Sequence, residues 1–167
     1  GNTLSLHDAL PIFTETELLA EILDEVDGID FTIIDTPPTP GLLIRLIYEA
    51  SDVLIVPTEL ELLSLDGLMG ILSVLGKLDL DLLGIIPNKY RKSTSIHDHN
   101  LSSLGSAAQN QGWPLFPPIA LRTNFAVASQ NQRMVWTLSP DSKATEEAFD
   151  MVRFAEERMR TWLAKTS

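Results

Sequence analysis

The residue whose type and position best suit a chemical role is Asp35, which follows a short apolar run and precedes a proline-rich turn. The run, residues 31–34, has the composition of a buried strand, so we expect Asp35 at the carboxyl end of a strand. Open α/β sheets bind ligands at that edge, where an acid can hold Mg²⁺ through a water molecule. The alternative is an acid that only caps the following turn, and the residues alone favour neither interpretation.

Two further apolar runs, 53–57 and 82–87, also end in polar residues. Thr58 and Glu59 follow the first run, and Asn88 follows the second. Because parallel strands end at one edge of a sheet, we expect these groups to converge with Asp35. The Asn88 amide both donates and accepts hydrogen bonds, which suits the edge of a purine base. Taken singly, each group has an alternative role as an ordinary turn residue.

Four basic residues outside the expected helices are candidates for contacts with nucleic-acid phosphates: Arg91, Lys92, Arg122 and Arg133. Solvated surface charge is the favoured alternative, because the net charge of −11 disfavours a nucleic-acid-binding surface overall. A metal site at His97 and His99 is disfavoured because no third ligand accompanies them. The pair Gly76-Lys77 is not a phosphate loop, because its spacing is wrong and no Ser or Thr follows the lysine.

The composition narrows the class of protein. With 167 residues, of which 44% are hydrophobic and 21% charged, the chain has the size and balance of one globular domain. The lack of cysteine excludes disulfides, thiolate metal sites and iron–sulfur ligation within these residues. No apolar run has the length needed to cross a bilayer, so we expect no transmembrane helix. The lack of cysteine is compatible with the cytoplasmic location that we expect, and we expect no membrane partner.

The first twelve residues need separate treatment because they lack the basic start and long apolar core of a secretory signal. Residues 1–12 resemble translated sequencing-adapter read-through, so we interpret them as a non-native segment. Residues 13–167 are then the part of the chain that folds, and the natural protein begins upstream. A short natural N-terminal arm is the alternative.

The apolar residues alternate between helical and strand periodicity along the chain. The expected helices are 14–26, 41–50, 62–77, 96–111 and 143–165, and the expected strands are 31–35, 53–57, 82–87 and 113–116. We expect the helix at 41–50 to be buried, residues 119–140 to form a polar loop with at most one short helix, and Asp141 or Ser142 to cap the last helix. This alternation predicts an α/β fold, a parallel sheet flanked by helices on both faces.

The candidate residues lie in three segments that together resemble the ParA/MinD superfamily of deviant Walker-type P-loop ATPases, and its ParA partition branch best. The segments are DFTIIDTPPTPGLL (30–43), SDVLIVPTELELLSLDGL (51–68) and LLGIIPNKYRKSTSIHDHNL (82–101). The resemblance implies an incomplete P-loop NTPase fold in an ATPase for plasmid or chromosome partitioning. It also implies an ATP- and Mg²⁺-dependent homodimer that binds DNA non-specifically and is triggered by a ParB-type activator.

The resemblance further implies roles for individual residues. It makes Asp35 the Walker B-like acid near Mg²⁺ and sets Asn88 against adenine. The other nucleotide-site residues that it implies are Thr36, Pro37 and Pro38 as a γ-phosphate switch, and Pro57, Thr58 and Glu59 on the nucleotide and dimer side. The positions at which it suggests DNA contacts are Arg91, Lys92 and Arg122.

The sequence departs from the family pattern in two places. The glycine-rich phosphate loop is not found before Asp35, and the usual Pro-Arg pair is not found at 120–121. Because phosphoryl transfer depends on the positioning groups of that loop, we expect this chain to hydrolyse no ATP and to bind it poorly, unlike its intact parent. In the family, the phosphate-loop strand separates the strands that match 31–35 and 53–57. Those two should therefore pair directly or leave open edges.

Two alternative functions remain. One is another ATPase of the superfamily that positions a different cargo, such as the septum site. The other is a non-catalytic scaffold that binds a partner protein. A membrane-anchoring C-terminal helix is disfavoured because acids are interspersed among its basic and apolar residues.

Overall fold

The computed structural model describes residues 15–37, 41–78 and 80–166. It divides into two compact units. The described residues of the N-terminal unit lie within Gly1–Asp52 and Leu78–Leu80, and those of the sheet unit lie within Val53–Lys77 and Asp81–Ser167. None of the helices in the described part of the chain is both long and apolar enough to span a membrane.

The N-terminal unit contains two helices, α1 (Glu15–Asp24) and α2 (Leu42–Glu49), which contact one another. Both helices were expected, but the expectation that the second is buried is wrong. In α2 only Ile47 is buried, while Leu42 and Leu43 are more than half exposed. An apolar periodicity shows which face a helix can bury, whereas burial itself requires a neighbouring surface to cover that face.

The expected strand before Asp35 does not form. Residues 31–37 have no regular secondary structure, and the side chain of Ile33 is 94% exposed. A strand is stable only when a neighbouring strand satisfies its backbone hydrogen bonds. No described segment pairs with 31–35, so the strand-like composition of this run is not realised.

The sheet unit is built on two parallel strands, β1 (Val53–Glu59) and β2 (Asp81–Asn88), as expected. Helix α3 (Leu62–Leu75) connects them, which is the crossover that parallel strands require. The register runs from Val53 opposite Asp81 to Glu59 opposite Asn88. Along its other edge, β1 has no partner among the described residues, which is the open-edge outcome of the two expected.

Residues 114–121 extend the sheet beside β2 without forming a regular strand. Isolated parallel bridges join Ile85 to Leu115 and Tyr90 to Ala120. The expected strand at 113–116 is therefore reduced to single bridges. Prolines at positions 114, 117 and 118 have no N–H to donate, so a continuous ladder cannot form here.

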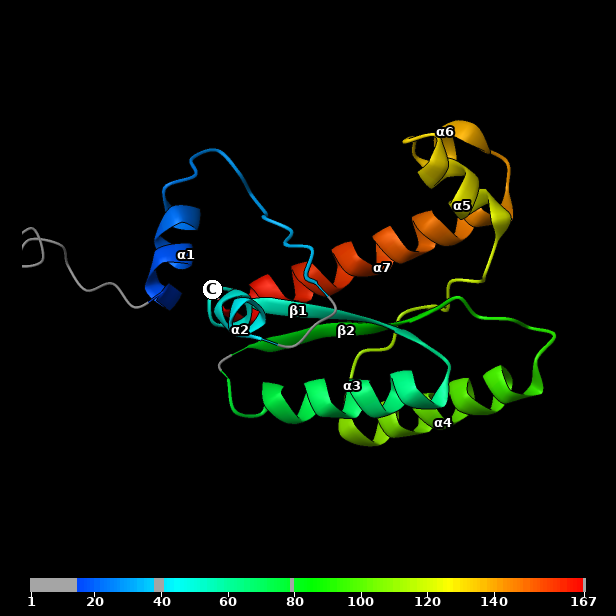
Figure 1. The fold of residues 1–167 in the computed structure, drawn as a ribbon, viewed down its shortest axis with the longest axis horizontal. Coiled ribbons are helices and arrows are strands. Elements are labelled where there is room, and N and C mark those ends of the chain that lie inside the picture. The colour runs from blue at the N-terminus through cyan, green and yellow to red at the C-terminus, as the bar shows by residue number, and fades with distance from the viewer. Residues whose placement is uncertain (1–14, 38–40, 79, 167) are drawn as a thin grey trace, which may run out of the picture. The chain divides into compact units, whose positions relative to one another are not determined.

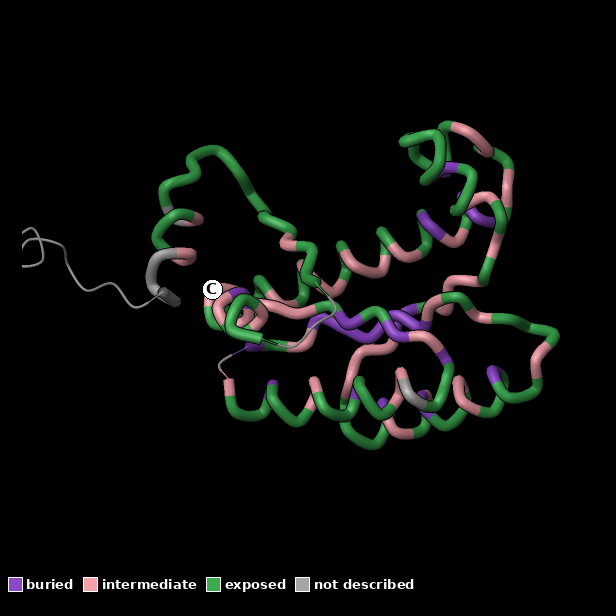
Figure 2. The backbone as a smooth tube through the Cα atoms, viewed as in Figure 1, coloured by how far each residue is buried: buried purple, intermediate pink, exposed green. Residues whose placement is uncertain are grey.

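Helices cover both faces of this small sheet (Figure 1). Helices α3 and α4 (Ser95–Gln111) lie on one face, and α7 (Lys143–Thr166) lies on the other. The core on the first face consists of Val56, Leu60, Leu68, Ile85 and Leu104. The buried positions follow the middle of both strands in Figure 2. On the second face the rings of Phe116 and Phe154 pack 4.6 Å apart.

The segment after the sheet contains two short helices, α5 (Thr123–Gln130) and α6 (Val135–Leu138), where at most one was expected. They form a second small core with the first turns of α7, made of Ala128, Val135, Ala144 and Ala148. The Ser142 hydroxyl accepts a hydrogen bond from the Thr145 amide at 3.2 Å, which confirms Ser142 as the cap of α7.

Gly84 in β2 lies close to the neighbouring segment 114–116, and substituting it tests this packing. A β-carbon at Gly84 would lie 2.4 Å from a ring carbon of Phe116 and 3.0 Å from the Pro114 carbonyl oxygen. We expect Gly84→Ala to lower the free energy of unfolding by about 1–3 kcal/mol, measured by urea denaturation. The control, Gly70→Ala, faces open space inside α3 and should raise it by about 0.5–1 kcal/mol. Equal stability of Gly84→Ala and the native chain would contradict this packing.

Candidate functional site

The carboxyl ends of β1 and β2 lie side by side, as the sequence predicts. Glu59 is opposite Asn88 in the register, and the next residue, Lys89, forms an ion pair with Glu59 at 2.5 Å. Thr58 is buried, and its hydroxyl lies 3.4 Å from the carbonyl oxygen of Ser64, in the first turn of α3. The strand ends therefore bring carboxylate, amide and ammonium groups to one edge of the sheet.

The predicted magnesium-side residues lie in the N-terminal unit. Asp35, Thr36 and Pro37 are exposed, and Pro38 is outside the described residues. No group of three potential metal-ligating side chains occurs in the described part of the chain. Because Mg²⁺ prefers several oxygen ligands, the described residues do not make a complete magnesium site. The role of Asp35 stays a prediction.

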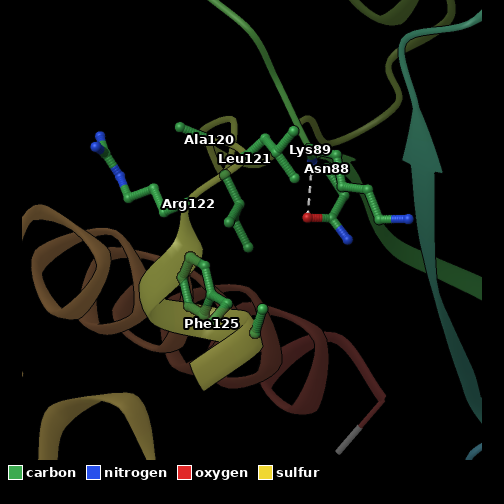
Figure 3. A pocket seen from close by; sticks show the side chains of 8 residues that line it. Asn88, Lys89, Ala120, Leu121, Arg122 and Phe125 are labelled. Carbon is green, nitrogen blue, oxygen red and sulfur yellow. Dashed lines mark hydrogen bonds between the residues drawn. The ribbon is translucent and has the colours of Figure 1, made fainter. Parts of the chain in front are cut away.

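A cleft of about 450 Å³ opens at the carboxyl end of β2 (Figure 3). Asn88 and Lys89 line one side, and the segment from Ile119 to Ala126 lines the other. Figure 3 shows Leu121 and Phe125 lying across the cleft from the Asn88 amide. The cleft therefore has mainly apolar side chains on one side and a polar amide on the other.

The local backbone fixes the orientation of the Asn88 side chain. Lys89 has a positive φ of 53°, and its amide donates to Asn88 Oδ1 at 2.9 Å. No partner for Asn88 Nδ2 occurs among the described residues, so its two hydrogens are available to a ligand in the cleft. With Oδ1 fixed by the Lys89 amide, the Asn88 side chain has a defined orientation and can form hydrogen bonds with the edge of a planar base.

Backbone hydrogen bonds hold the two walls of the cleft together. The Tyr90 amide donates to the Ile119 carbonyl, and the Leu121 amide donates to the Tyr90 carbonyl, both at 2.9 Å. Sequence reasoning missed Leu121 and Phe125 as site residues. No local pattern marks them, because their position depends on these contacts with a segment thirty residues away.

Arg122 at the cleft is bound by an acid from α7. Its Nε and Nη2 donate to the two carboxylate oxygens of Glu147, at 2.9 and 2.5 Å, and the Ala120 amide donates to the same carboxylate at 3.2 Å. These hydrogen bonds raise the pKa of the Arg122 guanidinium. Of the expected DNA contacts, Arg91 and Lys92 are exposed with no ion pair among the described residues, whereas Arg122 is engaged.

Comparison with known proteins gives the family. A family model described as an AAA domain matches residues 5–83. Protein IncC of Escherichia coli is 30% identical over 125 residues, which are 71% of this chain and 34% of that protein. The cell division ATPase MinD of Pyrococcus furiosus superposes with a TM-score of 0.69 at 20% identity. The chain belongs to the ParA/MinD superfamily.

The structural relatives confirm the predicted α/β P-loop NTPase fold. The Pyrococcus furiosus match covers 88% of this chain and 59% of MinD. The septum site-determining protein MinD of Pyrococcus horikoshii, complexed with Mg-ADP, gives a TM-score of 0.67 at 22% identity over 86% of this chain and 56% of that chain. This ParA/MinD chain therefore spans about a third of IncC and less than two thirds of each MinD protein.

The carboxylate of Glu147 organises one wall of the cleft, and we expect its removal to cost stability. Glu147→Ala leaves the Arg122 guanidinium and the Ala120 amide without their acceptor, which should lower the free energy of unfolding by about 1–3 kcal/mol. Urea denaturation measures this. The matched control is Glu146→Ala, also on α7, because its one ion pair among the described residues is with the exposed Lys143 and should contribute less than about 0.5 kcal/mol. Equal losses in both variants would contradict a structural role for the Arg122–Glu147 pair.

Proposed function

We propose that this chain supplies the base-binding part of the nucleotide site in a ParA-type ATPase. The observation that carries this proposal is the cleft between Asn88 and the Leu121–Phe125 wall, at the carboxyl end of β2. In open parallel sheets this edge is where nucleotides bind. Membership of the ParA/MinD superfamily supports adenine as the base.

The chemistry of the cleft suits adenine. The side chains of Leu121 and Phe125 offer apolar contact to the faces of a planar ring. Asn88 Nδ2 can donate to a ring nitrogen, and Asn88 Oδ1 keeps a second lone pair for the exocyclic amine. A base with the reverse pattern of donors and acceptors would leave one of these groups unpaired, which disfavours its binding.

The phosphate end of the site is not complete in these residues. The sequence contains no glycine-rich phosphate loop, and the described residues hold no complete magnesium site. We infer that the longer ATPase binds ATP and Mg²⁺, dimerises and hydrolyses ATP with groups that this polypeptide lacks. Asp35, with Thr36, Pro37 and Pro38, is proposed to serve the magnesium and γ-phosphate side there.

DNA partitioning is the cellular role that we propose for the longer ATPase, in the cytoplasm and with a ParB-type activator. The partition branch is the one that the three sequence segments resemble best, and exposed Arg91 and Lys92 offer a small basic patch on an otherwise acidic chain. A septum-site or other cargo is the alternative. Loss of plasmid or chromosome inheritance, without a division defect, on deletion of the gene would distinguish the two.

Binding of adenosine and ATP to the 167-residue chain tests the base site. We expect both to bind weakly and with similar affinity, because the phosphates find no dedicated loop, and we expect no ATP turnover. Asn88→Ala should weaken adenosine binding by about threefold to tenfold in an NMR titration. Asn110→Ala, at the exposed end of α4, is the control and should have no effect. Binding of ATP more than tenfold tighter than adenosine would place a phosphate site within this chain.

The salt dependence of DNA binding tests the two exposed cations in the longer ATPase. Arg91→Ala with Lys92→Ala should weaken binding at all sequences and reduce the slope of log affinity against log salt by about 2. The charge-matched control is Lys143→Ala with Arg153→Ala, because both cations already pair with acids on α7. An unchanged slope in the first variant would rule out these residues as phosphate contacts.

A further inference from the structure

His97 is a buried polar residue to which the nucleotide site has so far given no role. Its side chain is 3% exposed, at the start of α4. Nδ1 accepts a hydrogen bond from the Arg91 backbone amide at 3.2 Å, and Nε2 lies 3.1 Å from a carboxylate oxygen of Glu61. The imidazole therefore bridges the segment after β2 and the residue that precedes α3.

The partners of His97 determine its tautomer. An amide N–H can only donate, so Nδ1 must present its lone pair to Arg91. The ring proton is then on Nε2, where it is donated to Glu61. The Glu61 carboxylate thus keeps Nδ1 in the accepting form, which is the usual way in which a partner at one ring nitrogen sets the function of the other.

The segment held by His97 is the polar wall of the cleft. Three residues before Arg91 stands Asn88, and between them Lys89 has the left-handed backbone conformation. On the opposite side, Tyr90 is bonded to the backbone of 119–121. The Tyr90 hydroxyl donates to Asp98 of α4, one residue beyond His97. The wall is therefore fixed from α4 on one side and from the apolar wall on the other.

We propose that His97 is a positioning residue for the base-binding cleft. By holding the Arg91 amide, it keeps the turn 88–91 in the conformation that points the Asn88 amide at the ligand. It contacts no ligand itself and acts through the backbone. The assignment rests on the proposed function, in that the cleft is taken to hold a base.

Two substitutions separate the contacts of His97. In His97→Asn, Oδ1 takes the place of Nδ1 and can still accept from the Arg91 amide, while the contact with Glu61 is lost. In His97→Gln, the terminal amide reaches the place of Nε2 and can still donate to Glu61, while the acceptor for Arg91 is lost. Packing is disturbed in both variants, so any difference between them reports the Nδ1 contact.

The readouts are amide hydrogen exchange, the chemical shift of the Asn88 side-chain amide, and adenosine affinity, all by NMR on the 167-residue chain. In His97→Gln we expect the Arg91 amide to exchange about tenfold faster, the Asn88 shift to move and adenosine affinity to fall by about threefold to tenfold. In His97→Asn all three should stay near the native values. The amides of Ile85 and Phe116, which donate to the carbonyls of Pro114 and Ile85 outside the turn 88–91, report whether the fold is retained.

A second variant keeps the experiment decisive if His97→Gln does not fold. Glu61 is exposed, so Glu61→Ala should fold, and it removes the acceptor that keeps the proton on Nε2. We expect the long-range ¹⁵N spectrum of His97 to show a protonated Nδ1 fraction and the Arg91 amide to exchange faster. Faster Arg91 exchange should accompany this protonated fraction, and unchanged exchange in its presence would overturn the proposal.

Equal effects of His97→Asn and His97→Gln would also overturn it, because the residue would then act through packing alone. Faster Arg91 exchange with an unmoved Asn88 shift would show that the contact does not position the wall. If the native chain binds no adenosine, the proposed base site fails. The Arg91 exchange and the Asn88 shift would still decide whether His97 fixes this turn.

Discussion

The parallel ladder between β1 and β2 is the constraint on which the rest of the sheet unit depends. Its register places Glu59 opposite Asn88, so it determines which polar groups meet at the carboxyl edge of the sheet. It also sets where α3 and α4 must begin, because each helix follows directly from a strand end or the turn after it. Burial of Val56 and Ile85 between the helical layers stabilises the same ladder. The core and the cleft thus both depend on the pairing of β1 with β2.

The parts that the sequence predicted well are those whose pattern and environment agree. Strands β1 and β2 are apolar runs that pair with one another, and their ends converge as expected. Helices α3, α4 and α7 form at the expected positions and cover the two faces of this sheet (Figure 1). The run at 31–34 has an equally strong pattern, yet it is not a strand because no described segment pairs with it. Whether a run forms a strand therefore depends on a neighbouring strand with which it can pair, as well as on its side chains. The burial expected for α2 was wrong for the same reason.

Only the sheet side of the candidate site could be predicted from the sequence. Thr58, Glu59 and Asn88 follow strands, so a rule about sheet edges locates them. Leu121 and Phe125 come from a segment whose path is set by hydrogen bonds to Tyr90 and by the acid Glu147 on α7. The bond between Arg91 and His97 is likewise invisible in the sequence, where His97 resembles half of a metal pair. Contacts of this kind join residues that share no local pattern.

The positive φ of Lys89, beside the cleft, restricts which residues suit this position. A residue with a β-carbon in the left-handed region costs about 1 kcal/mol, which glycine at that position would avoid. Glycine, however, would have no ammonium group for Glu59, and it would make the turn beside Asn88 freer to move. Lysine at this position therefore has a less favourable backbone conformation than glycine would have. In return, it forms the ion pair with Glu59 and restricts the backbone of the turn beside the cleft. In a chain selected for thermostability alone, we would expect glycine at position 89.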